Sequence, residues 1–293
     1  MGIDFNRKYY CNGEMVYIPK KGIDLPCKKN EVNIITEIGS DIFRCIVISD
    51  LHIGSAYQNE DAWNKIIDYC VINNIHTIII AGDFLDGINV GKPFCKIHND
   101  PIKQIEYALK RYPSDNGILN YLILGNHDVD SLVSYGIDFA TIINNYRHDI
   151  VAVGYGYGKI NVKNEKIIVS HPLGIGINND LDLGNNYLLL KGPHHRNRSI
   201  IGGTGNCSLT IPSLSNIFLT ENEFLPGAID LTIKFKDGFF ETIYYDHLLI
   251  SNNIYCVSST QFSVSRSKDK KVEKSIKHEE IMPKKRQLTC SNK

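Results

Sequence analysis

The segment Ile46-Val47-Ile48-Ser49-Asp50-Leu51-His52 decides how the rest of this chain is interpreted. Aliphatic residues stand together in it, and the segment then turns polar abruptly and ends in an acid and a histidine. A short aliphatic run rich in Ile and Val is typical of a strand buried on both faces of a layered sheet. The same order recurs at 78–83, Ile-Ile-Ile-Ala-Gly-Asp, and at 121–128, Tyr-Leu-Ile-Leu-Gly-Asn-His-Asp. The chain therefore repeats one pattern, in which a buried strand ends in polar residues.

The segments between these runs have the apolar spacing of amphipathic helices, at residues 59–74 and 101–111. Strand, helix, strand, helix, strand predicts a parallel sheet with right-handed crossovers. In open sheets of this type, ligands bind beyond the carboxyl ends of the strands. All three aliphatic runs deliver Asp, His or Asn to that edge. A metal centre is expected there.

The second half of the chain has a different pattern. After a short helix at about 136–146, strand-like segments follow in quick succession, at 149–153, 158–162, 166–170, 188–191, 199–212, 228–235 and 239–250. They predict a second sheet packed against the first, so the fold class is α/β. On the N-terminal side, the strand-like segments 32–38 and 43–49 flank Gly39-Ser40-Asp41, which predicts a hairpin.

The composition is that of a globular protein. The chain has 293 residues, of which 43% are hydrophobic and 22% charged, with a formal net charge of zero. Zero net charge excludes a whole-protein attraction to polyanions, so any such attraction must be local. No apolar run is long enough to span a bilayer. The eight cysteines include no C-x-x-C pair, which argues against a zinc ribbon and favours buried thiols. A soluble cytoplasmic protein is expected.

The chain is predicted to have one domain with two flanking segments. Residues 1–31 form an N-terminal extension, 32–257 the domain, and 258–293 a polar, basic and disordered tail. The tail is interpreted first as a solvated segment. The alternatives are an electrostatic arm for nucleic acid or, at Lys284-Lys285-Arg286, a nuclear import signal.

The polar strand ends carry several short motifs that are common individually. Asn126 alone is explained by a helix cap, and His171 by a core histidine. Together they form an ordered set: Asp50-Leu51-His52, Gly82-Asp83, Gly125-Asn126-His127-Asp128, His171 and Gly192-Pro193-His194-His195. The set resembles, in order, the motifs of the calcineurin-like metallophosphoesterases, over roughly residues 44–250. The resemblance implies a four-layer α-β-β-α sandwich of the metallophosphoesterase type, with the small bacterial and phage phosphodiesterases as its nearest form.

The resemblance also implies a role for each motif residue in a two-metal site. Asp83 is expected to bridge two divalent cations, Mn first, with Fe, Zn or Ni as alternatives. Asp50, His52 and His195 would complete the first site, and Asn126 and His171 the second. A hydroxide that bridges the metals would attack phosphorus. His127 would protonate the leaving-group oxygen as general acid, and Asp128 would hold the His127 ring and its protonation state. A supporting structural role is the alternative for His127.

The last motif departs from the family pattern, which is usually Gly-His-x-His. Pro193 occupies the place of a metal-binding histidine, so the second site is expected to be weak. His194 rotating into that place, or a water molecule, would compensate. His194 is otherwise a substrate contact or an exposed residue. Arg196 and Arg198 follow the motif and are candidates for binding phosphate, with surface charge as the alternative.

Three functions are compatible with the sequence. The first is hydrolysis of phosphodiester bonds in nucleic acid or nucleotides. The second is hydrolysis of phosphomonoesters, including those of phosphoproteins. The third, from another class, is a binding scaffold that kept the fold and lost the chemistry; retention of Asp50, Asp83, Asn126 and His127 argues against it, and Pro193 argues for it. No membrane partner is expected, and the sequence does not point to a protein partner.

Overall fold

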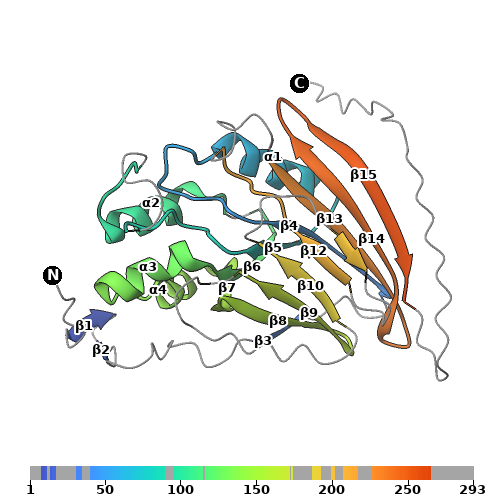
Figure 1. The fold of residues 1–293 in the computed structure, drawn as a ribbon, viewed down its shortest axis with the longest axis horizontal. Coiled ribbons are helices and arrows are strands. Elements are labelled where there is room, and N and C mark those ends of the chain that lie inside the picture. Colours follow the sequence, from blue (N-terminus) through green and yellow to red (C-terminus); the bar gives the residue numbers. More distant parts are fainter. Residues whose placement is uncertain are drawn as a thin grey trace.

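The computed structural model describes residues 8–11, 14–17, 31–34, 40–89, 96–114, 116–171, 173, 187–192, 199–201, 207–216 and 226–264. These residues form two large sheets, a separate two-stranded sheet and a layer of helices (Figure 1). None of the helices in this part of the chain combines the length and the apolar character that crossing a bilayer requires.

The larger sheet has seven strands in the order β15-β14-β13-β4-β5-β6-β7. Its parallel half pairs each strand with the next along the chain, namely β4 (Ile42–Ile48), β5 (Thr77–Ala81), β6 (Leu119–Leu124) and β7 (Ile150–Tyr155). Its antiparallel half is added beside β4 and consists of β13 (Gly227–Lys236), β14 (Phe239–Ile250) and β15 (Ile254–Ser263). The predicted parallel order of the first strands is confirmed.

The second sheet has six strands in the order β11-β12-β10-β9-β8-β3. Its strands are β3 (Glu31–Ile34), β8 (Tyr157–Val162), β9 (Glu165–Ser170), β10 (Tyr187–Lys191), β11 (Ser199–Ile201) and β12 (Cys207–Thr210). A separate two-stranded hairpin is formed by β1 (Lys8–Cys11) and β2 (Glu14–Tyr17). The α/β class with two sheets is confirmed.

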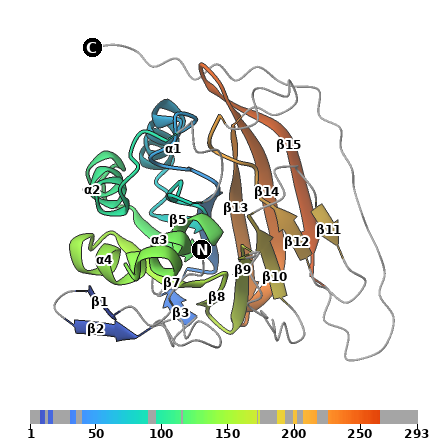
Figure 2. The same cartoon turned by 60° about the vertical axis from the view of Figure 1, so that its left-hand side comes forward.

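The four helices of the described chain gather on one side of the seven-stranded sheet (Figure 2). They are α1 (Glu60–Ile72), α2 (Pro101–Arg111), α3 (Asn126–Tyr135) and α4 (Phe139–Tyr146). The side chain of Asn59 caps α1 by accepting a hydrogen bond from the Ala62 amide. Asp100 caps α2 in the same way, with Pro101 in the first turn.

The parallel half of the seven-stranded sheet is buried on both faces, which explains its continuous aliphatic runs. Ile46 and Ile48 of β4 pack in the core on the helix side. Cys45 and Val47 of the same strand pack against the six-stranded sheet. Alternate residues of a strand point to opposite faces, so a strand between two layers needs apolar residues at every position.

Three details differ from the predictions. The hairpin across Gly39-Ser40-Asp41 is wrong, because β3 joins β8 in one sheet and β4 lies in the other. The sequence pattern missed α3, and β15 continues the sheet past residue 257, the predicted end of the domain.

Candidate metal centre

The polar residues meet where the carboxyl ends of strands from both sheets come together. Asp50 and His52 follow β4, Asp83 follows β5, and His127 lies in the first turn of α3, just after β6. His171 follows β9 of the other sheet. Ligand atoms of Asp50, Asp83 and His171 all lie within 4.8 Å of one another, and so do those of a second group, His52, Asp86 and His127.

The backbone that carries the first two motifs adopts a left-handed conformation at three non-glycine residues. Asp50, His52 and Asp83 have φ of 54°, 48° and 52°. Such values are uncommon outside glycine and are maintained where the surrounding structure imposes them. Hydrogen bonds between the two loops impose them here: the Asp50 amide donates to the Gly82 carbonyl at 3.0 Å, and the His52 amide to the Asp83 carbonyl at 3.1 Å. The loops that follow β4 and β5 are therefore joined by hydrogen bonds into one unit.

Two glycines of the sequence motifs permit the close approach of the ligand groups. A Cβ atom on Gly125 would collide with Oδ1 of Asp83. A Cβ atom on Gly192 would collide with the Ala81 carbonyl and with the ring of His171. These positions exclude any larger residue for a steric reason, whatever their backbone angles.

Asp83 lies at the middle of the cluster. Its Oδ2 atom is 3.1 Å from Nε2 of His171 and 3.9 Å from Nε2 of both His52 and His127. Nδ1 of His171 donates to the Ala81 carbonyl at 2.8 Å, which turns Nε2 toward Asp83. Nε2 of His52 also lies 3.7 Å from Oδ1 of Asp50. One carboxylate is thus shared by both halves of the site.

The residues fit divalent cations. Asp50, Asp83 and Asp86 are 1%, 3% and 4% exposed, and burying carboxylates is costly unless positive charge compensates them. In each group the imidazole nitrogens and carboxylate oxygens lie within 4.8 Å of one another, and this mixed donor set suits Mn, Fe, Zn or Ni. His52 and His171 each turn the other ring nitrogen toward a carboxylate or a carbonyl, the usual support of a metal-binding histidine.

The carboxylates shift the pKa values of the buried histidines. Burial lowers the pKa of His52, but Asp50, Asp86 and Asp83 outweigh burial and raise that pKa to about 10. Burial likewise lowers the pKa of His171, and the charge of Asp83 raises it to about 9. Burial raises the pKa of Asp83, whereas the facing histidines, His171 first, hold it well below its usual range. Without a cation, protons on the histidines neutralise the carboxylates.

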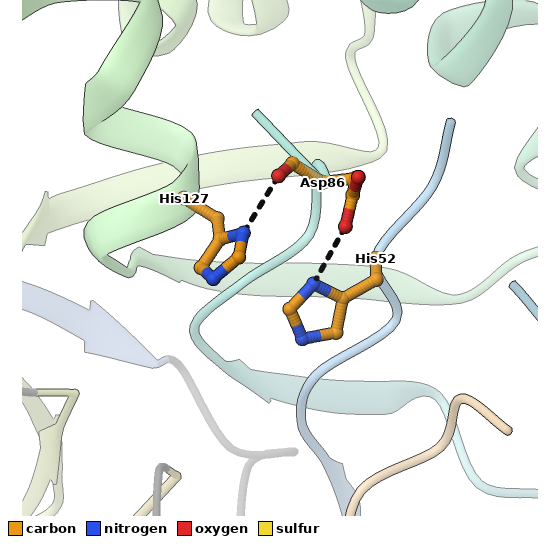
Figure 3. A group of neighbouring side chains, drawn as sticks. All are labelled: His52, Asp86 and His127. Carbon is orange, nitrogen blue, oxygen red and sulfur yellow. Dashed lines mark hydrogen bonds and ion pairs between the residues drawn. The ribbon is translucent and has the colours of Figure 1, made fainter. Parts of the chain in front are cut away.

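His127 is oriented by a different group from the one expected. Its Nδ1 atom donates to the backbone carbonyl of Asp86 at 2.6 Å, so Nε2 lies on the side of the ring away from that carbonyl (Figure 3). The His127 amide donates to Oδ1 of Asp83 at 3.0 Å. The side chain of His127 is 13% exposed and that of His52 is 3% exposed, so the ring of His127 is the more accessible of the two. Burial lowers the pKa of His127.

Asp128 has another role than the predicted one of holding the His127 ring. Its carboxylate accepts hydrogen bonds from the backbone amides of Phe84 at 3.2 Å, Leu85 at 2.7 Å and Gly125 at 2.8 Å. Asp128 therefore joins the loop after Asp83 to the start of α3. The burial of its carboxyl group and the charge of Asp83 raise the pKa of Asp128, and the three N–H donors oppose the shift.

Asp86 is the site residue that the sequence analysis missed. Its side chain contacts His52 and its carbonyl contacts His127. The signal was present in Gly82-Asp83-Phe84-Leu85-Asp86, where a second acid follows the first at the end of one strand. Its role depends on the bend of the loop, which local spacing does not show.

The remaining predicted residues are placed only in part. Asn126 is the first residue of α3, half-buried, between Gly125 and His127. Pro193, His194, His195, Arg196 and Arg198 lie outside the described residues. Gly192, just before them, donates its amide to the Ser170 carbonyl at 2.9 Å.

An α/β fold with buried carboxylates and imidazoles at the strand ends defines a class, the metal-binding α/β proteins. The family model of the calcineurin-like phosphoesterases matches residues 43–205. The match spans more than half of the chain, and the chain belongs to this family. The family uses a dinuclear metal centre, and the two groups of Asp and His residues are candidates for it.

Solved structures with a similar fold include two phosphoesterases. Yfce, a phosphoesterase from E. coli, is 13% identical with a TM-score of 0.44, over 76% of this chain and 100% of that one. A dimetal phosphatase from Danio rerio is 10% identical with a TM-score of 0.46, over 76% of this chain and 99% of that one. No curated protein matches the sequence.

Proposed function

We propose that this protein is a metal-dependent phosphodiesterase that acts on nucleic acid or nucleotides. The proposal that this protein is a hydrolase rests on the position of Asp83. Its Oδ2 atom lies 3.1–3.9 Å from the Nε2 atoms of His52, His127 and His171. One carboxylate shared by two sets of ligands is what a two-metal site requires, and a histidine beside it is placed to transfer a proton.

The chain's own residues would hold the cations and keep the ligand side chains in place. Asp83 would be the ligand common to both cations, Asp50, His52 and His195 would hold the first, and Asn126 and His171 would hold the second. When bound, the cations, Mn²⁺ first, supply the Lewis acidity that phosphoester hydrolysis needs. The left-handed backbone at Asp50, His52 and Asp83 keeps these side chains in place before a cation arrives.

His127 is the proposed general acid. Since Nδ1 donates to the Asp86 carbonyl, a protonated ring carries its second proton on Nε2, on the side of Asp83. Nε2–H would donate its proton to the leaving-group oxygen of a bound phosphoester. Proton transfer to that oxygen would leave a neutral imidazole whose Nδ1–H still bonds the carbonyl, so the ring would keep its orientation during the step.

The preference for diesters is supported by charge in the sequence. Arg196 and Arg198 follow the last motif, and the chain beyond residue 265 contains many basic residues, among them Lys268, Lys270 and Lys271. Clusters of positive charge attract polyanions such as nucleic acid. Because Pro193 replaces a usual histidine, the second cation is proposed to bind more weakly than the first.

The test compares hydrolysis of bis-p-nitrophenyl phosphate and p-nitrophenyl phosphate, with and without Mn²⁺. The variants are wild type, His127→Ala and, as a control, His76→Ala at an exposed histidine. Mn²⁺-dependent diester cleavage that His127→Ala reduces by about 10²–10⁴-fold, the range for general acids, would support the proposal. Faster cleavage of the monoester would favour the phosphatase alternative. Bound metal without turnover of either ester would favour the scaffold and direct attention to Pro193→His.

A further inference from the structure

A buried lysine lies beside the metal centre and belongs to none of the sequence motifs. The side chain of Lys96 is 2% exposed, and Nζ lies 2.8 Å from Oδ2 of Asp86. The backbone around Lys96 is attached to the loop that follows His52, through a bridge between Lys96 and Ser55 and a 2.7 Å hydrogen bond from the Ile97 amide to the Gly54 carbonyl. Burial of an ammonium group is costly unless a negative charge accompanies it. The Asp86 carboxylate supplies that charge.

Asp86 connects Lys96 to both histidines of the second group. Oδ2 of Asp86 pairs with Lys96, while Oδ1 lies 3.3 Å from Nδ1 of His52, an ion-pair contact rather than a well-aligned hydrogen bond. The backbone carbonyl of Asp86 accepts the hydrogen bond from Nδ1 of His127 (Figure 3). Both imidazoles therefore direct Nδ1 to Asp86, and Nε2 of each lies 3.9 Å from Oδ2 of Asp83.

The ion pair between Lys96 and Asp86 also affects whether His52, Asp86 and His127 are suited to binding a cation. His52, Asp86 and His127 have the spacing of a cation site. However, the charge of Asp86 is already balanced by Lys96, and Nδ1 of His127 is used by the Asp86 carbonyl. An additional cation among these three residues would have to displace the ammonium group. The cluster is therefore better suited to supporting the ligands around Asp83 than to binding a metal of its own.

We propose that Lys96 is a positioning residue of the metal centre. It holds Asp86 in place, so that the Asp86 carboxylate orients the ring of His52 and the Asp86 backbone carbonyl orients the ring of His127. The consequence of orienting His127 rests on the proposed function, in which His127 is the general acid. The consequence of orienting His52 concerns metal binding alone. A merely structural role, in which Lys96 only attaches one loop to another, predicts lower stability with unchanged metal binding.

The experiment measures metal binding rather than turnover. Mn²⁺ affinity is determined by calorimetry, and the visible absorption of Co²⁺ reports the ligand geometry. The variants are Lys96→Met, Lys96→Arg, Asp86→Asn and the double variant Lys96→Met/Asp86→Asn. Lys163→Met is the control, because Lys163 pairs with Asp41 at 2.7 Å, beyond the end of β8 that lies away from the site.

Lys96→Met is expected to weaken Mn²⁺ binding by about 10- to 100-fold, the usual range for partners that orient metal ligands, and to change the Co²⁺ spectrum. Lys96→Arg is expected to restore most of the affinity, and Lys163→Met to have none of these effects. In the Asp86→Asn background, Lys96→Met is expected to change the affinity less than about twofold, because Lys96 acts through Asp86.

Folded Lys96→Met with wild-type affinity and spectrum would overturn the proposal. So would full additivity in the double variant. If Lys96→Met does not fold, the comparison of Asp86→Asn with the double variant carries the test: equal affinity supports the proposal, and weaker binding in the double variant refutes it. A wild type that binds Mn²⁺ but cleaves no phosphoester would refute the proposed function and leave these measurements valid.

Discussion

Nε2 of His171 lies 3.1 Å from Oδ2 of Asp83, although His171 ends a strand of the six-stranded sheet and Asp83 ends a strand of the seven-stranded one. The contact joins the two sheets at the candidate metal centre. Nδ1 of the same ring donates to the Ala81 carbonyl, so one nitrogen of His171 contacts β5 and the other contacts the loop after it. The packing of one sheet on the other thereby determines the geometry of the ligands.

Asp83→Asn is expected to remove most of the metal affinity. The substitution keeps the shape of the side chain but deletes the charge that both halves of the site share. Partners that only orient ligands are worth about 10- to 100-fold in affinity, so loss of the shared carboxylate is expected to exceed that range. Calorimetric titration with Mn²⁺ checks it, with Asp68→Asn on the exposed face of α1 as control. Equal affinities in the two variants would contradict the central role of Asp83.

Metal affinity is expected to rise with pH between about 6 and 9. The raised pKa values, about 10 for His52 and about 9 for His171, mean that both rings are protonated in the metal-free protein at neutral pH. A cation must displace these protons, because only a neutral imidazole binds metal. Titration with Mn²⁺ in buffers of different ionisation enthalpy counts the protons released. Affinity that is independent of pH in this range would be inconsistent with the charged cluster.

The stability of the metal-free protein is expected to fall as pH rises, whereas the metal affinity rises. A histidine whose folded pKa is raised contributes stability that is fully present below its unfolded pKa of 6.5 and is lost as pH rises through about 9 and 10. The lowered pKa of Asp83 adds stability that is present above 3.8 and lost in acid. Urea midpoints after chelation should therefore decline from pH 6.5 to pH 10. A midpoint that increases over this interval would argue against protonated His52 and His171.

Gly125→Ala is expected to damage the site through steric collision alone. The added methyl group would collide with Oδ1 of Asp83, and overpacking of this kind typically costs about 1–3 kcal/mol of stability. Gly117→Ala is the matched control, since its Cβ meets open space but its φ of 74° carries backbone strain of about 1–2 kcal/mol. Both variants should lose stability in urea unfolding, and only Gly125→Ala should also lose Mn²⁺ affinity.

Asp128→Ala is expected to destabilise the protein by at least about 2 kcal/mol. It leaves the amides of Phe84, Leu85 and Gly125 without their acceptor, and one unsatisfied buried donor costs about 1–3 kcal/mol. Urea unfolding measures the loss. Asp128→Asn separates the two roles considered for this residue: the imidazole resonances of His127 should titrate as in wild type if Asp128 binds only the backbone. A large shift in that titration would restore the role predicted from the sequence.

Local patterns in the sequence were sufficient for the parallel half of the larger sheet. Burial on both faces requires apolar residues at every position, and an abrupt polar ending marks the point where a strand reaches the sheet edge. These two signals predicted β4, β5 and β6 and the ligand candidates Asp50, His52 and Asp83 at their ends. The structure brings these three residues together with His127 and His171.

Strands that pair in a sheet can lie far apart along the chain, and no local sequence pattern shows which strands will pair. For that reason β3 appeared to form a hairpin with β4, while the structure pairs it with β8. The strand β15 was missed because its residues are mostly exposed and polar, so its pairing with β14 leaves no apolar pattern in the sequence. The start of α3 at Asn126 was hidden by the motif that occupies its first turn.

The sequence by itself determined the α/β class, the family and the identities of most candidate ligands, because those depend on residue types at short spacing. Only the tertiary structure decided which groups support the ligands. Asp128 binds backbone amides, and the carbonyl of Asp86 orients His127. Lys96 reaches Asp86 because two loops pack together. Hydrogen bonds and ion pairs of this kind depend on distances and angles between segments, which are set only when the loops fold against one another.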